Sequence, residues 1–168
     1  MNNFKYKNTL IVGRFYPFHL GHKNMIDFAL QDSERVHVIV CVRDEQTVTG
    51  EMRMEWIQKS FDYEPRLNII LLFQDELGIP DDGSQIWANL AQDMVGASTD
   101  IDAVVTSEPY QKEYAGLLGA ELVLYNPERT FHPISATRLR ADLEAHKDFL
   151  DPHVFDDLQG IESMPSDV

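Results

Sequence analysis

Cysteine is almost absent from this sequence: its 168 residues include only one, Cys41. A single cysteine excludes a disulfide within the chain and a metal site built from several thiolates, and it suits a reducing compartment. Long apolar runs are missing too, since no stretch approaches the roughly 20 apolar residues of a membrane span. Residues 1–5 contain no signal-peptide core. These absences lead us to expect a cytoplasmic protein that has no contact with membranes.

Basic residues are also scarce: 14 Lys and Arg stand against 28 Asp and Glu, which gives a formal net charge of −14. We do not expect so acidic a chain to bind nucleic acid, because phosphate backbones need a basic surface. A small anionic ligand held by a local group of cations is compatible with this charge. The sequence leaves open whether the chain forms a homo-oligomer.

Apolar residues follow strand and helix periods in alternation, without an internal repeat. We expect strands at Thr9–Val12, Arg35–Val42, Leu67–Phe73, Ile101–Thr106 and Leu122–Tyr125. Helical spacing falls at residues 22–30, 51–61, 84–94 (after an N-cap at Ser84), 110–118 and 136–143, with loops at 43–50 and 74–83. This order predicts an α/β fold with a Rossmann-like, doubly wound, parallel five-stranded sheet and helices on both faces. Residues 1–160 suit a single domain, and the acidic residues 161–168 are expected to fray.

Residues 13–22, Gly-Arg-Phe-Tyr-Pro-Phe-His-Leu-Gly-His, join the first strand to the first helix. A strand, a short turn and a helix aim backbone N–H groups and the positive end of the helix dipole at the space above the strand, which suits a phosphate. His19 precedes the helix and His22 lies in its first turn, so both side chains can face one point. The alternative is an ordinary connection with two incidental histidines, one of them a helix cap.

In open parallel sheets, ligands bind beyond the carboxyl ends of the strands, where the strand order reverses. The turn that carries the two histidines follows the first strand, so it lies in this region. We expect the residues that follow strands two to four (43–49, 74–83, Ser107 and Glu108) to line the same crevice.

A second group of cations lies at residues 129–140, Arg-Thr-Phe-His-Pro-Ile-Ser-Ala-Thr-Arg-Leu-Arg. Ser135 is a natural N-cap, and a helix follows it. Arg138 and Arg140 lie in the first turns of this helix, where cations are unfavourable unless an anion is bound. Arg129 and His132 lie just upstream. The alternative is that these arginines pair with some of the many carboxylates.

Both segments resemble the signatures of the nucleotidyltransferase superfamily. Residues 13–22 have every fixed position of G-x-F-x-P-x-H-x-G-H, and residues 134–140 have every fixed position of I-S-x-T-x-[IL]-R. The two signatures also occur in the expected order. Between them, the chain is similar to nicotinamide-nucleotide adenylyltransferases of the archaeal type and to the adenylyltransferase half of bacterial multifunctional NAD-synthesis proteins. No G-x-x-x-x-G-K-[ST] loop follows, so we expect only the transferase.

Three features carry the finer resemblance. Arg53 lies at the arginine of a loop-to-helix segment, although the chain reads Thr-Gly-Glu-Met-Arg where the archaeal type has Thr-Ala-Gly-Glu-Arg. Residues 79–81 and Trp87 are similar to the segment whose tryptophan stacks on nicotinamide. Residues 126–131 are similar to the bacterial members. From its spacing alone, Trp87 is equally compatible with a place in the core.

The resemblance implies that the phosphate of nicotinamide mononucleotide, or of its nicotinate form, attacks the α-phosphorus of ATP and releases pyrophosphate. Mg²⁺ would be bound mainly by phosphates and water. It implies catalytic roles for His19, His22 and Arg140. It implies nucleotide contacts for Gly13, Arg14, Phe15, Arg53, Trp87, Arg129, Ser135, Thr137 and Arg138. Two alternatives stay open at this point: a related adenylyl- or cytidylyltransferase for phosphopantetheine or a phospho-alcohol, and a non-catalytic nucleotide sensor. A class I aminoacyl-tRNA synthetase fragment shares a similar H-x-G-H, but we discount it because the chain is acidic and lacks a Lys-Met-Ser-Lys-Ser loop.

Overall fold

The computed structural model contains a parallel sheet of five strands in the order β3-β2-β1-β4-β5. The structure describes residues 3–79, 84–128, 130, 134–161 and 164. The strands are β1 (Tyr6–Gly13), β2 (Ser33–Val42), β3 (Leu67–Phe73), β4 (Ala103–Thr106) and β5 (Glu121–Leu124). All neighbouring strands pair in parallel, so the predicted Rossmann-like doubly wound sheet is confirmed.

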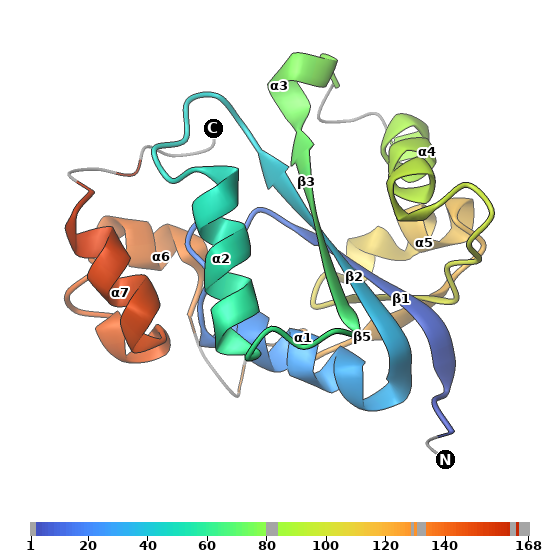
Figure 1. Cartoon of the computed structure of the whole chain (residues 1–168), viewed down its shortest axis with the longest axis horizontal. Helices are drawn as coiled ribbons and strands as arrows, with labels where there is room; N and C mark the ends of the chain where they lie inside the picture. Colours follow the sequence, from blue (N-terminus) through green and yellow to red (C-terminus); the bar gives the residue numbers. More distant parts are fainter. Residues whose placement is uncertain (1–2, 80–83, 129, 131–133, 162–163, 165–168) are drawn as a thin grey trace.

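Helices connect the strands and cover both faces of the sheet (Figure 1). They are α1 (Leu20–Asp32), α2 (Gly50–Ser60), α3 (Gln74–Leu77), α4 (Ser84–Val95), α5 (Lys112–Leu117), α6 (Ala136–Ala141) and α7 (Pro152–Gln159), with 3-10 turns η1 (Pro109–Gln111) and η2 (Lys147–Phe149). Within the described residues, no helix is long and apolar enough to cross a membrane.

Each face of the sheet carries its own hydrophobic cluster. The larger cluster packs α1, α2, α6 and α7 against one face, with Ile26, Trp56 and Leu139 among its most buried side chains. The smaller cluster packs α4 and α5 against the other face, through Ala91 and Ala115. Figure 1 shows the same division, with α2, α6 and α7 on one side and α4 and α5 on the other. This arrangement buries the central strands β1 and β2 from both sides, as their nearly continuous apolar sequences require.

Polar contacts fasten α7 to the helices that flank the site. Trp56 Nε1 of α2 donates to Asp157 Oδ2 at 2.8 Å. Lys23 Nζ of α1 lies 3.0 Å from Asp151 Oδ2, and the Ser60 hydroxyl donates to the same carboxylate oxygen at 2.7 Å. Although burial alone raises it, the hydrogen bonds from Ser60 and Lys23 lower the pKa of Asp151 overall. The end of the described chain thereby braces the first turn of α1.

Several predicted element ends differ from the structure. The predicted loop at 74–83 begins with the helical turn α3. The turn ends at Gly78, whose backbone N–H donates to the carbonyls of Asp75 and Gln74. Ser84 is the first residue of α4 instead of its cap. The helix after Ser135 stops at Ala141, so Leu143 lies beyond it. The differences arise because local propensity does not determine where tertiary contacts stop an element. In the segment 161–168, which was expected to fray, Ile161 and Met164 pack against the larger cluster. The other residues of this segment lie outside the described ones.

Candidate active site

A cleft of about 400 Å³ opens at the carboxyl ends of β1 and β4. The chain leaves β1 toward β2 on one side and later returns to β4 on the other side, so the strand order reverses between β1 and β4. This is the place where open α/β sheets bind ligands. The lining residues come from both signatures and from the ends of all five strands: Val12, Gly13, Arg14, Phe15, His19, Gly21, His22, Met25, Cys41, Gln74, Trp87, Thr106, Ser107, Glu108, Gln111, Tyr125, Asn126 and Ile134.

The two histidines form one stacked pair at the start of α1. Their ring centroids lie 3.7 Å apart with an interplanar angle of 22°. His19 is the N-cap of the helix: its Nδ1 accepts from the backbone N–H groups of Gly21, at 3.1 Å, and His22, at 3.4 Å. His22 Nδ1 accepts in return from the His19 N–H at 3.3 Å. An Nδ1 that accepts cannot carry the proton, so both neutral rings carry it on Nε2.

This reciprocal capping confirms one part of the structural alternative, the helix cap, and leaves the proposed phosphate contacts as a prediction. His19 caps the helix, as the structural alternative had it, and both rings also line the cleft. The backbone bonds set the orientation of each ring, because an imidazole held at Nδ1 has little rotational freedom. The neutral form of each ring therefore has its N–H at Nε2, with the ring held in place through Nδ1.

Two glycines make this turn sterically feasible. A Cβ at Gly21 would lie only 2.8 Å from Cε1 of the His19 ring, which caps the helix, and would therefore clash with it. A Cβ at Gly13 would lie 3.1 Å from Phe15 Cζ. Phe15 itself has φ of 51°, a left-handed backbone conformation that is rare for a bulky residue, and its side chain is buried. Such strain is characteristic of functional turns that the surrounding structure holds in place.

The second signature approaches the turn from α6. Ile134 lines the cleft, and Ser135 caps α6 by accepting from the Arg138 N–H at 3.2 Å. Arg140 Nη1 donates to the Tyr16 carbonyl at 2.6 Å, and its Nη2 lies 3.4 Å from the Thr137 hydroxyl. Among the described residues no carboxylate pairs with Arg140. Ile134 is thus the one residue of this signature in the described lining, which does not include Ser135, Thr137, Arg138 or Arg140.

The structure does not bring Arg53 into the cleft. Its side chain has no exposed surface. Nε donates to the Thr49 carbonyl, Nη1 to the carbonyls of Arg14 and Cys41, and Nη2 to Gln46 Oε1 and the Val48 carbonyl, at 2.7–3.3 Å. All five N–H groups are used in this way, because a guanidinium has only five. In this structure Arg53 therefore connects Cys41 at the end of β2 to Arg14 in the signature turn, without lining the cleft.

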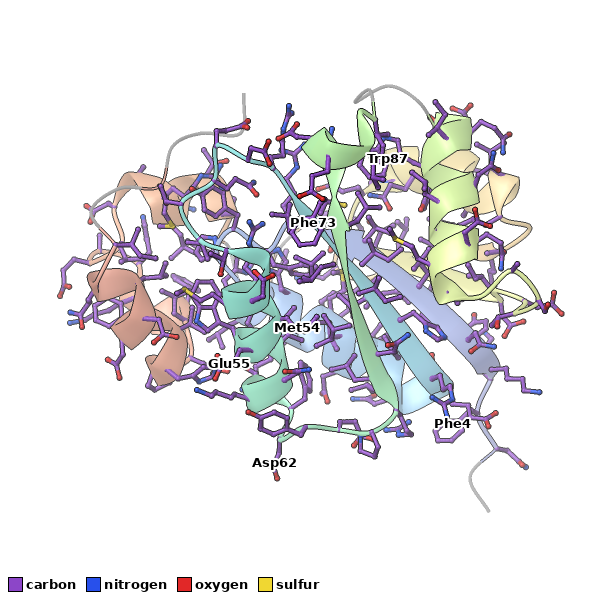
Figure 2. The ribbon with its side chains drawn as sticks, turned by 45° about the horizontal axis from the view of Figure 1, so that its top comes forward. Phe4, Met54, Glu55, Asp62, Phe73 and Trp87 are labelled. Carbon is purple, nitrogen blue, oxygen red and sulfur yellow. The ribbon has the colours of Figure 1, made fainter. Side chains whose placement is uncertain are left out.

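Trp87 occupies both of the environments that its spacing allowed. The side chain is half-buried, packs against the smaller cluster and also lines the cleft. Figure 2 shows it beside α3, at the end of the molecule where β3 finishes. An indole in this position offers an aromatic wall to a ligand while its other contacts hold it in place.

The predicted crevice was correct for some loops and not for others. Gln74, Ser107 and Glu108 line the cleft, whereas residues 43–49 do not. Arg129 and His132 lie outside the described residues. Sequence reasoning missed the lining residues Cys41, Gln111, Tyr125 and Asn126, and two of these could have been found by applying the rule of strand ends to β5 as well.

The chemistry available in the described cleft excludes a cysteine nucleophile. Burial raises the pKa of the Cys41 thiol to about 12, and the charges of Arg14 and Arg53 lower it by less. The Ser107 hydroxyl donates to the Tyr125 carbonyl at 2.6 Å instead of to a base. Glu108 is the one carboxylate in the described lining, and no three described His, Cys, Asp or Glu side chains form a metal-binding group. The described lining offers hydrogen-bond donors, the aromatic side chains of Phe15, Trp87 and Tyr125, and the cation Arg14.

The structure thus combines a Rossmann-like parallel sheet with paired histidines at the strand-order reversal, and comparison with known proteins gives the family. The model of the cytidylyltransferase-like family matches residues 10–142, and the chain belongs to that family. It is similar to the trifunctional NAD biosynthesis/regulator protein NadR of Escherichia coli (strain K12), with 28% identity over 145 residues that cover 78% of this chain and 35% of that protein. The chain thus spans about a third of the length of the curated relatives it matches.

Two solved structures share the fold. A NadR protein in complex with NAD and AMP-PNP superposes with a TM-score of 0.66 at 22% identity, covering 89% of this chain and 45% of that one. A bifunctional NMN adenylyltransferase/ADP ribose pyrophosphatase from Francisella tularensis, complexed with AMP and a manganese ion, superposes with a TM-score of 0.71 at 19% identity, covering 94% of this chain and 50% of that one. These two likenesses show the shared fold, and the family match over residues 10–142 gives the class, nucleotidyltransferase.

Proposed function

We propose that this domain transfers the adenylyl group of ATP to nicotinamide mononucleotide, forming NAD and releasing pyrophosphate. The observation that carries the proposal is the stacked histidine pair, whose backbone-held rings present Nε2–H donors to a cleft at the strand-order reversal. The relatives whose names include NAD biosynthesis or NMN adenylyltransferase support the choice of acceptor. Trp87 supports it as well, because a cationic pyridine ring is attracted to an indole face.

In the proposed reaction, an oxygen of the mononucleotide phosphate attacks the α-phosphorus of ATP. The bond from that phosphorus to the bridging oxygen of the β-phosphate breaks, and pyrophosphate leaves with the electron pair. No side chain has to become covalently bound, which fits the raised pKa of Cys41 and the bond of Ser107 to a carbonyl in the described lining. Catalysis then depends on positioning and charge stabilisation. His19 and His22 donate to the α- and β-phosphate oxygens as charge grows there, and Arg14 contacts the triphosphate from the same turn.

The border of the cleft would hold the rest of the triphosphate. Ser135 uses its oxygen as a cap acceptor, so its hydroxyl proton can still be donated to a phosphate. Thr137, Arg138 and Arg140 lie on the same short helix. Mg²⁺, which would neutralise phosphate charge, fits a cleft whose described lining has a single carboxylate, because it is commonly bound by one or two carboxylates together with substrate phosphates. Glu108 is the residue that would hold it.

The test is a mass-spectrometric assay of the purified chain with ATP or CTP and a panel of acceptors. The panel includes nicotinamide mononucleotide, nicotinate mononucleotide, phosphopantetheine and a phospho-alcohol. We expect NAD and pyrophosphate in equal amounts, and a loss of about 10²–10³ in rate for His22→Ala, which excludes a contaminating enzyme. Turnover of another acceptor in preference would replace the assigned substrate. Nucleotide binding without any product would favour a sensor.

A further inference from the structure

Tyr16 occupies a position that the first signature leaves unspecified, between Phe15 and Pro17. Its side chain has no exposed surface and does not line the cleft. Its hydroxyl lies 3.2 Å from both the backbone nitrogen and the hydroxyl of Thr47, in the loop before α2. The ring is therefore held at both ends, by the turn that carries it and by a second loop.

Two guanidinium groups share this ring. The Cζ atom of Arg140 lies 5.2 Å from the ring centroid, and that of Arg53 lies 5.3 Å from it. Both distances are within the range in which an aromatic face attracts a cation. Arg140 also donates to the Tyr16 carbonyl at 2.6 Å, so one residue holds this guanidinium through both its backbone and its ring.

The two arginines differ in what they have left to offer. Arg53 uses its five N–H groups on neighbouring carbonyls and on Gln46, so its guanidinium is committed to the fold. Arg140 donates only to the Tyr16 carbonyl and to Thr137 within the described residues, and no described carboxylate offsets its charge. Its guanidinium lies beside the backbone that leads directly into the cleft-lining Phe15.

We infer that Tyr16 is a positioning residue that orients Arg140 toward the phosphates of the bound nucleotide and so links the two signature segments. The inference rests on the proposed function. A guanidinium on a long flexible stem stabilises growing charge best when its direction is set before the substrate arrives. The ring sets that direction, and the contacts to Arg53 and Thr47 hold the ring.

The test is a double-mutant cycle on ATP affinity and on turnover, with Tyr16→Leu, Arg140→Ala and the combination. Each single change should weaken ATP binding and lower kcat by about tenfold, while the KM of the acceptor stays nearly unchanged. The combination should be no worse than Arg140→Ala alone, because Tyr16 acts through Arg140. Tyr16→Phe keeps the ring and should bind ATP within about twofold of the unchanged protein.

Stability is controlled separately, because Tyr16 is buried. Val36→Ala, a fully buried change at the amino end of β2, should lower the melting temperature without altering ATP affinity. If Tyr16→Leu does not fold, pentafluorophenylalanine at position 16 keeps the volume but reverses the charge distribution of the ring, and it should weaken ATP binding as Leu would. Additive losses in the double mutant, or ATP binding that stays unchanged in Tyr16→Leu, would overturn the inference.

The same experiment separates this inference from the proposed function. Wild-type turnover with nicotinamide mononucleotide tests the substrate, whereas the cycle on ATP affinity does not need an acceptor. Turnover together with additive losses would remove the role of Tyr16 and leave the reaction in place. Non-additive losses in ATP affinity without that turnover would keep the role of Tyr16 and overturn the assigned acceptor.

Discussion

His19 caps α1 in this structure and is proposed to act on the substrate phosphates, and one pair of substitutions can separate these two roles. As the N-cap of α1, its Nδ1 accepts from the N–H groups of Gly21 and His22. It also lines the cleft, and in the proposed reaction its Nε2–H donates to a phosphate oxygen. Ala removes both functions. Asn keeps an acceptor at the cap, where it is among the best residues, but it cannot extend a donor to the place of Nε2.

The magnitudes follow from these contacts. Loss of the cap costs about 1 kcal/mol of unfolding free energy, or about 3 °C in melting temperature for a domain of this size. Asn should therefore melt about 3 °C above Ala, since both variants lose the same stacking on His22. Turnover should fall by about 10²–10³ in both, because each lacks a donor that acts on growing charge.

Melting temperature and kcat at saturating substrates, measured on one preparation, check both expectations. Thr49→Ala is the matched control, because Thr49 caps α2 by accepting from the Met52 N–H at 3.1 Å and does not line the cleft. It should lose about 1 kcal/mol and keep its turnover. An Asn variant within about threefold of wild-type turnover would show that His19 is only a cap. Equal melting temperatures for Asn and Ala would refute the capping argument.

Three further outcomes are expected. Trp87→Ala should raise the KM of nicotinamide mononucleotide about 5- to 30-fold with little effect on the KM of ATP, and Trp87→Phe should restore much of the loss; a large fall in melting temperature with equal damage to both substrates would make Trp87 a core residue instead. Arg53→Lys should cost about 3 kcal/mol of unfolding free energy, measured in urea, because it leaves buried carbonyls without donors; altered KM values at unchanged stability would make Arg53 a ligand contact. Burial, reinforced by the charge of Arg35, lowers the pKa of His37 from 6.5, so below that pH the unfolded chain binds more protons and unfolding free energy should fall on acidification. His37→Leu should flatten that slope between about pH 7 and 5.5, and an unchanged slope would assign it to other groups.

Much of the fold was predictable because its determinants are local. Apolar runs of strand length alternate with helical spacing, and only a parallel sheet with helices on both faces accommodates that order. The predicted strand Leu67–Phe73 coincides with β3. The predicted cap at Ser135 is confirmed by its bond to the Arg138 N–H. Element ends were less predictable, as α3 and the early end of α6 show, because packing decides where a helix stops.

The sequence by itself determined two features: the turn of residues 13–22 and the parallel sheet above which it lies. Gly13, Gly21 and the two histidines are readable from one short segment, because their roles depend on neighbours within ten residues. Only the tertiary structure decided which partners Arg53, Arg140 and Tyr16 contact. Arg53 donates to the carbonyl of Arg14, 39 residues away along the chain, and Arg140 donates to the carbonyl of Tyr16, 124 residues away. No local sequence pattern predicts such contacts. An arginine committed to carbonyls and an arginine proposed to contact an anion look alike in sequence, and burial and hydrogen-bond partners distinguish Arg53 from Arg140.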